Sequence, residues 1–170
     1  MKINKGYKYR IYPNEAQKCL IDKNINCSRF VYNYILGKSI EYYSVNKKPM
    51  KLSIETEMKK EFTWLKECDS IALQQSRINL DTAYKKFFKE KAVGFPKFKS
   101  KRKSSNSYRT VNKNKTIRLE CNKIKVPKLG FVSIKLHRNL PIESKICSAT
   151  LLEKNGKYYI SILVEYEQEI

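Results

Sequence analysis

Residues 7–14, Tyr-Lys-Tyr-Arg-Ile-Tyr-Pro-Asn, decide which fold class the sequence indicates. Tyr7 to Tyr12 alternate aromatic or apolar side chains with basic ones, which is typical of a half-buried β-strand. Pro13 ends the strand. Asn14, with Gln17 three residues later, forms a capping-box pattern, so a helix should begin here. A strand followed at once by a long helical region predicts that its β partners lie much later in the chain.

The helical region extends to about residue 98. The first helix should end near Asn24, and a turn at Asn24–Asn26 should lead into a second helix, which reads as a helix-turn-helix or a generic helical hairpin. Ser53 is the expected cap of a third helix. Asp69-Ser70 should cap the longest helix, about 70–89.

The predicted helix 70–89 carries two stripes at helical spacing. Leu73, Leu80, Tyr84 and Phe87 form the stripe expected to face the core. Gln74, Arg77, Asp81 and Lys85 form the other stripe, with Gln75 beside it. Amides near a helix start suit adenine edges, and the cations suit phosphates. A solvated helix face with no ligand would read the same way.

From Tyr108 onward, the hydrophobic period changes to two, and strands are expected with hairpins at Cys121-Asn122 and Asn155-Gly156. The expected fold class is therefore α+β, an OB-like β-barrel lobe interrupted by an inserted helical lobe. Residues 1–12 and 107–170 should form the barrel lobe, 13–98 the helical lobe, and 99–106 a basic connecting loop.

Positive charge is concentrated in one part of the chain. Residues 85–138 hold 18 of the 36 Lys and Arg residues and only two acids. The densest run, Lys97 to Lys103, is interrupted by Phe98, and Tyr108-Arg109 follows soon after. Cations release counterions from phosphates and aromatic rings stack on bases, so this composition predicts nucleic-acid binding.

Catalytic motifs are not found. The sequence has no phosphate-binding glycine loop, nucleophile elbow or HExxH, one histidine (His137), and five dispersed cysteines without a CxxC pair. We therefore expect no enzymatic activity, no metal and no cofactor. No apolar run approaches the roughly 18 residues of a membrane span, and the N-terminus lacks a signal-peptide core. The expected location is the cytoplasm, in association with the nucleoid.

Several segments together resemble one family. These are Tyr7–Pro13 with Gln17, Arg29–Asn33, Leu73–Gln75, Leu80–Tyr84, Phe87-Phe88, Gly94–Lys99, Ser107–Arg109, Lys125–Gly130 and Tyr158–Glu165. In this order and spacing they are similar to the N-terminal region of the insertion-sequence transposases called TnpB or OrfB, which are RNA-guided DNA endonucleases.

The resemblance implies a wedge-type β-barrel lobe interrupted by a helical recognition lobe. It implies two partners, a structured guide RNA and DNA carrying a short flanking motif. The motif-reading positions would be Lys51, Leu52, Thr56, Ser70, Gln74, Lys113 and Asn114. Phosphate or RNA contacts are expected from Arg77, Lys85, Lys97, Lys99, Lys101, Arg102, Lys103, Tyr108, Arg109, Arg118, Lys125 and Lys128.

The family continues into an RNase H-like nuclease domain that this sequence does not reach, so the expectation is binding without cleavage. Three other hypotheses stay open. The chain could be a general, ribosome-associated RNA-binding protein. It could be a non-functional transposon remnant, for which exposure of Ile162, Leu163 or Tyr166 would argue. It could also be a subunit completed by a separately encoded nuclease half. The sequence does not define the oligomeric state.

Overall fold

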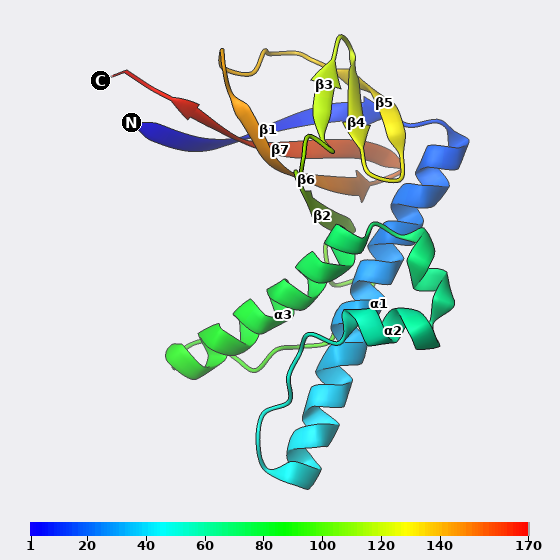
Figure 1. The fold of residues 1–170 in the computed structure, drawn as a ribbon, viewed down its shortest axis with the longest axis vertical. Coiled ribbons are helices and arrows are strands. Elements are labelled where there is room, and N and C mark those ends of the chain that lie inside the picture. The colour runs from blue at the N-terminus through cyan, green and yellow to red at the C-terminus, as the bar shows by residue number, and fades with distance from the viewer. Residues whose placement is uncertain (170) are drawn as a thin grey trace. The chain divides into compact units, whose positions relative to one another are not determined.

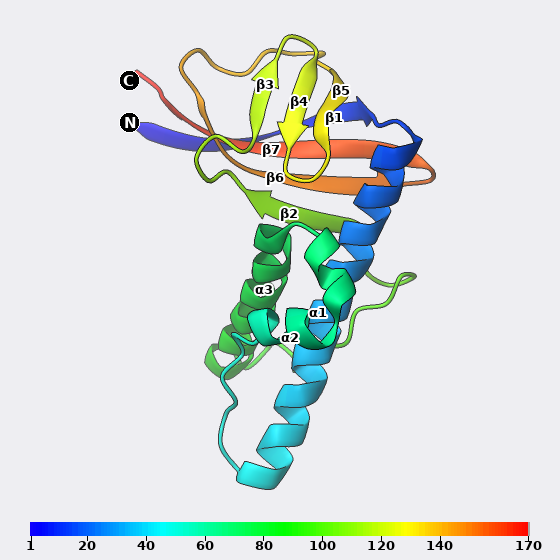
Figure 2. The same cartoon turned by 45° about the vertical axis from the view of Figure 1, so that its right-hand side comes forward.

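The computed structural model describes residues 1–169 and contains both helices and strands (Figures 1 and 2). The helices are α1 (Glu15–Asn46), α2 (Glu55–Glu61), the 3₁₀ helix η1 (Thr63–Glu67) and α3 (Ser70–Lys89). The strands are β1 (Lys2–Tyr12), β2 (Ser107–Val111), β3 (Arg118–Glu120), β4 (Lys123–Val126), β5 (Gly130–Lys135), β6 (Lys145–Lys154) and β7 (Lys157–Glu167).

The chain divides into two compact units. Residues 1–23 and 106–170 form the sheet unit, and residues 24–105 form the helical unit. The predicted lobe boundaries, 1–12 with 107–170, 13–98 and 99–106, remain a prediction.

The sheet unit is a curled, antiparallel half-barrel of seven strands in the order β2-β6-β7-β1-β5-β4-β3. β1 pairs with β7 along most of its length, from Lys2 opposite Glu167 to Ile11 opposite Tyr158, and with β5 at its end. The predicted pairing of the first strand with later strands is therefore confirmed. Tyr9, Ile11, Ile160 and Ile162 are buried on one face of this sheet.

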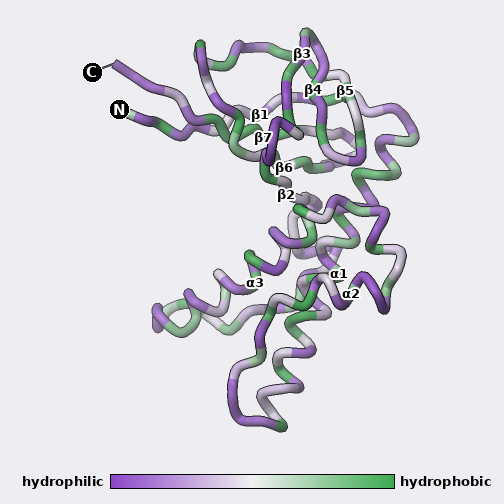
Figure 3. Tube along the Cα trace, viewed as in Figure 1, coloured by the Kyte–Doolittle hydropathy of each residue, from purple (hydrophilic) through white to green (hydrophobic). Residues whose placement is uncertain are grey.

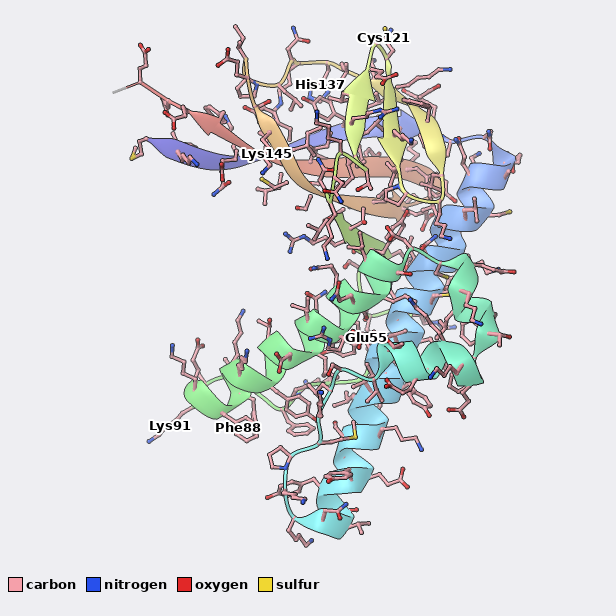
Figure 4. The ribbon with its side chains drawn as sticks, viewed as in Figure 1. Glu55, Phe88, Lys91, Cys121, His137 and Lys145 are labelled. Atoms are coloured by element: carbon pink, nitrogen blue, oxygen red, sulfur yellow. The ribbon has the colours of Figure 1, made fainter. Side chains whose placement is uncertain are left out.

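Both predicted hairpin turns form. Asn155 and Gly156 have φ angles of 54° and 76°, the left-handed conformations that a two-residue hairpin turn requires. They join Lys154 to its partner Lys157. Cys121 at the β3–β4 turn also has a positive φ of 54° and lies at the tip of the hairpin (Figure 4).

The capping box at the start of α1 is confirmed in both directions. The Gln17 amide N–H donates to Asn14 Oδ1 at 2.8 Å, and the Asn14 N–H donates to Gln17 Oε1 at 2.9 Å. The Gln17 side-chain amide also donates to the carbonyls of Leu129 and Phe131, at 3.2 and 2.8 Å. One side chain therefore caps the helix and attaches its first turn to β5.

The predicted turn at Asn24–Asn26 is wrong, because α1 runs without interruption from Glu15 to Asn46. Asn24 is fully buried, and its Oδ1 accepts a hydrogen bond from the Asp69 N–H at 2.8 Å. The Asn24 side chain that suggested a turn is therefore bonded to a distant segment and does not compete for the backbone of α1. No glycine or proline lies near Asn24 to end the helix. Hydrophobic and hydrophilic residues are interspersed along α1 (Figure 3).

In the helical unit, the residues that form the core come from every helix. The cluster includes Val31, Ile35 and Leu36 from α1, Met58 from α2, and Leu65, Leu73 and Leu80. The Asp69 side chain accepts from the Ile71 N–H at 3.0 Å, so the predicted cap of the longest helix is confirmed. The predicted Ser53 cap is wrong: α2 begins after Ile54 without a side-chain cap. Leu73 and Leu80 are buried as predicted.

Candidate nucleic-acid interface

The α2–α3 face of the helical unit is organised around one ion pair. Arg77 of α3 places both Nη2 and Nε 3.3 Å from Oε1 of Glu55, the first residue of α2. Both side chains are mostly buried, so the pair fixes the start of α2 against α3. Figure 4 shows Glu55 at this position. Arg77, predicted to contact phosphate, is thus already neutralised by a carboxylate.

Gln74 and Thr56 flank this pair, one turn before Arg77 on α3 and next to Glu55 on α2. Gln74 is half-buried, and within residues 1–169 its amide has no hydrogen-bond partner. Ser70 instead accepts a hydrogen bond from Lys59 Nζ at 2.9 Å. The Gln74 amide is therefore available to a ligand, and Thr56 is exposed at the start of α2.

The basic segment Lys97–Lys103 is anchored on α1 at one residue. The Asn33 side chain donates to the Lys99 carbonyl and accepts from the Lys99 N–H, both at 2.8 Å. The Phe98 ring lies over Gly37, where an added Cβ would meet it at 3.8 Å. The segment is therefore attached to α1 by the Lys99 backbone and by the Phe98 ring.

A tight turn then presents the cations of residues 101–103, here called the basic turn. Ser100 and Ser104 close it: the Ser104 N–H donates to the Ser100 carbonyl at 2.9 Å, and the Lys103 N–H donates to Ser100 Oγ at 3.1 Å. Lys101, Arg102 and Lys103 are exposed and have no ion pair within the described residues. Three cations on an ordered backbone are well suited to phosphates.

Lys99 differs from its neighbours. Its Nζ lies 4.3 Å from the centroid of the Tyr32 ring, a cation–π contact. Burial lowers the pKa of this amine, and the nearby positive charge of Arg29 lowers it further. The prediction that Lys97, Lys99 and the basic turn would serve alike as phosphate contacts therefore needs refinement, because Lys99 packs inward.

In the sheet unit, the predicted cations lie on several strands. Arg109 on β2 is exposed and donates to Ser148 Oγ at 3.2 Å. Arg118 on β3 lies over the Phe131 ring at 5.7 Å and pairs with Glu120 at 3.0 Å. Lys125 lies opposite Phe131.

The remaining residues predicted in this unit have different environments. Tyr108 is buried, only 3% exposed, so its ring is not presented for stacking on bases. Lys113 and Asn114 are exposed in the β2–β3 loop, and Lys128 is exposed at the β4–β5 turn.

A cation–aromatic ladder of Lys8, Arg10, Tyr12 and Tyr159 was not predicted as a site. Arg10 lies over the rings of Tyr12 at 5.0 Å and Tyr159 at 5.6 Å, and Lys8 lies over Tyr159 at 4.9 Å. Arg10 stands opposite Tyr159 in the β1–β7 register. The signal was present in the sequence, because alternation from Tyr7 to Tyr12 places Lys8, Arg10 and Tyr12 on one face of the strand.

No group of three or more His, Cys, Asp or Glu side chains within residues 1–169 could hold a metal ion. His137 is exposed, and its ring lies 5.2 Å from that of Tyr9 (Figure 4). Among the described helices, none is long and apolar enough to cross a membrane.

Comparison with known proteins points to one family. Residues 1–48 match the model of the OrfB/IS605 helix-turn-helix domain. A protein of Escherichia coli strain K12, named "Putative RNA-guided DNA endonuclease InsQ", is 31% identical over 173 residues, which cover 98% of this chain and 42% of that protein. The N-terminal part of the chain thus carries an OrfB/IS605-type helix-turn-helix domain, and nearly the whole chain is similar to a protein named as an RNA-guided DNA endonuclease.

Two further relatives are similar to this chain. A Streptomyces pristinaespiralis protein, also named as an RNA-guided DNA endonuclease, is 29% identical over 96% of this chain and 42% of its own length. Virulence protein VsdF of Salmonella dublin is 35% identical over 54% of this chain and 88% of its own length. The chain thus spans under half the length of the two endonuclease relatives. The matches support a transposase-related, nucleic-acid-binding module.

Proposed function

We propose that this chain binds DNA through its helical unit and structured RNA through its sheet unit, without cutting the DNA. The basic turn is the observation that carries the proposal. Its three exposed cations stand on a backbone held by the turn's own hydrogen bonds and, through Lys99, by Asn33. An ordered cationic turn in a chain of net charge +20 favours a polyanion that is recognised by shape.

The DNA contact would be a short flanking motif, read from the α2–α3 face. Gln74 has a free amide that matches the donor and acceptor of an adenine edge, and Thr56 would add a contact from the start of α2. The resemblance adds Lys51, Leu52 and Ser70 of the helical unit as further motif contacts. It also assigns Lys113 and Asn114 to the motif, and these two residues would be a separate DNA contact made by the sheet unit. Because Glu55 neutralises Arg77, we assign Arg77 a structural role, in which its ion pair holds α2 against α3, the helix that carries Gln74.

The RNA contact would be the outer face of the sheet. The cation–aromatic ladder combines flat rings with positive charge, a combination that binds unpaired bases and their phosphates. Arg109, Arg118, Lys125 and Lys128 would add phosphate contacts. In this proposal the half-barrel corresponds to the OB-like wedge lobe of the family, which the helical recognition lobe interrupts. The protein would be associated with the nucleoid.

The test of the DNA assignment is base preference in a randomised duplex library. Gln74→Ala should relax preference at one position, by about 1–3 kcal/mol of discrimination. Gln75→Ala is the matched control, because Gln75 is the adjacent amide on α3 and is also half-buried. A wild-type protein that binds every duplex equally would refute the role of Gln74. If the chain binds DNA without cutting it, a target duplex incubated with the protein and Mg²⁺ should stay uncut.

The test of the RNA assignment is the nucleic acid that copurifies from native cells at about 150 mM salt, where the Debye length is about 8 Å. One discrete structured RNA supports the proposal. A mixture of ribosomal and messenger RNA would favour the general RNA-binding protein instead. A nuclease half that copurifies would identify a subunit completed by a second chain.

The transposon-remnant hypothesis expected exposed apolar residues near the end of the chain. Ile162 is fully buried, and Leu163 and Tyr166 are half-buried. This burial favours a folded module over an aggregation-prone fragment.

A further inference from the structure

The helical unit contains an open groove of about 750 Å³. It lies between the second half of α1 and the second half of α3, and residues 49–53 and Phe95 complete its walls. A groove of this volume is within the range of sites that bind small organic groups.

Aromatic rings dominate one side of the groove. Tyr84 and Phe88 of α3 are nearly parallel, with an interplanar angle of 15° and centroids 6.3 Å apart. Phe95 meets Tyr84 edge-on at 5.5 Å and Phe87 at 5.3 Å. Phe88 is 76% exposed, and Tyr43 on the α1 side is 56% exposed. Figure 4 shows Phe88 near the end of α3. Exposed rings at this density offer flat faces for another flat group.

Polar groups occur at few places in this wall. Tyr84 Oη and Ser39 Oγ are 2.6 Å apart and satisfy each other. The Asp81 carboxylate, half-buried, pairs with Lys85 at 3.3 Å, and the exposed Lys51 also lines the groove. A carboxylate can accept a hydrogen bond from an N–H group at the edge of a base, and the two lysines can contact the phosphate that precedes or follows it.

We propose that the groove receives one unstacked base of a nucleic-acid strand, with its phosphate held by Lys51 and Lys85. This inference rests on the proposed function, because it assumes that DNA or RNA reaches the helical unit. The alternative occupant, an apolar protein segment, is less consistent with the charge at the groove, since the lining includes Lys51 and Lys85 and the whole chain has a net charge of +20.

The test compares two fluorescent single strands of equal length and charge, oligo-dT and the same backbone with abasic sites. A base in the groove predicts that the wild-type protein binds oligo-dT more tightly. Phe88→Ala should weaken oligo-dT binding by about fivefold or more, the usual effect of losing one stacking contact, and should leave binding of the abasic strand unchanged. Val45→Ala is the matched control, since Val45 is also 76% exposed on α1 but does not line the groove.

A second measurement locates the base. Strands with one 5-iodouracil should crosslink on irradiation to Tyr43, Phe88 or Phe95, as identified by mass spectrometry. Equal affinity for both strands, or crosslinks only outside the groove, would overturn the inference while leaving nucleic-acid binding intact. If neither strand nor any duplex binds, the proposed function fails as well. Self-association that Phe88→Ala abolishes, with no difference between the strands, would instead identify a protein as the occupant.

Discussion

Asn33 offers a direct test of whether the basic segment is ordered before it meets a ligand. Its side chain makes two hydrogen bonds of 2.8 Å to the Lys99 backbone, one donated and one accepted. Each net hydrogen bond contributes about 0.5–1.5 kcal/mol, so Asn33→Ala should lower the stability of this attachment by about 2 kcal/mol. The population in which residues 97–99 are detached should then rise about 30-fold.

Limited trypsin digestion measures that population, since cleavage follows the detached form when reattachment is fast. The bonds after Lys97 and Lys99 should be cut about 30-fold faster in Asn33→Ala than in the wild type. Nucleic-acid affinity should fall while its salt dependence stays the same, because the cations remain and only the cost of ordering them increases.

Asn46→Ala is the control, because the Asn46 side chain bonds only to the Tyr42 carbonyl, one turn earlier in α1. If Asn33→Ala is cut at the same rate as Asn46→Ala, the Asn33 contact does not order the segment. A reduced salt dependence in Asn33→Ala would also refute the reasoning, since it would mean that phosphate contacts were lost.

Three further predictions follow from the contacts. Charge reversal of Lys101, Arg102 and Lys103 to Glu should weaken binding of all nucleic acids alike. It should also reduce the slope of log affinity against log salt concentration by about 2 to 3, measured by filter binding at several salt concentrations. An unchanged slope would contradict this. Gln17→Ala removes the capping-box bond from the Asn14 N–H and the two side-chain bonds to the carbonyls of Leu129 and Phe131. Urea unfolding should therefore show a loss of about 1–3 kcal/mol, against little change for Gln75→Ala. Burial, followed by the hydrogen bond to Asp22, raises the pKa of Tyr158 to about 12. The free energy of unfolding of the wild type should therefore fall as pH rises from 10 toward 12, and that of Tyr158→Phe should fall less. The same pH dependence of urea unfolding in both proteins would rule this out.

The sequence predicted elements best where a short local pattern has one conformation. Asn155-Gly156 tolerates the positive φ angles of a tight hairpin turn, Asn14 with Gln17 caps a helix, and Asp69 caps another, and all three are confirmed. In each case the residues that determine the structure are within a few positions of one another.

Sequence patterns are least informative where a distant partner determines the environment of a residue. Asn24 resembles a turn residue until the Asp69 N–H is placed beside it. Arg77 resembles a free phosphate ligand until Glu55, 22 positions earlier, is seen to pair with it. Tyr108 resembles a stacking ring beside a basic run, yet the strand alternation buries it. The groove is harder still, because four separate segments have to be in place before its walls form.

The open edges of the half-barrel have a consequence for the behaviour of the isolated protein. Within residues 1–169 the sheet ends at β2 on one side and at β3 on the other, and an unpaired strand edge invites another chain to add to it. β3 has only three residues, two of them charged, and β2 carries the exposed Arg109. These charges therefore protect the edges from aggregation. A variant made less basic at Arg109 or Arg118 would lose solubility together with nucleic-acid affinity, so its aggregation state needs to be measured before a weaker binding constant is interpreted.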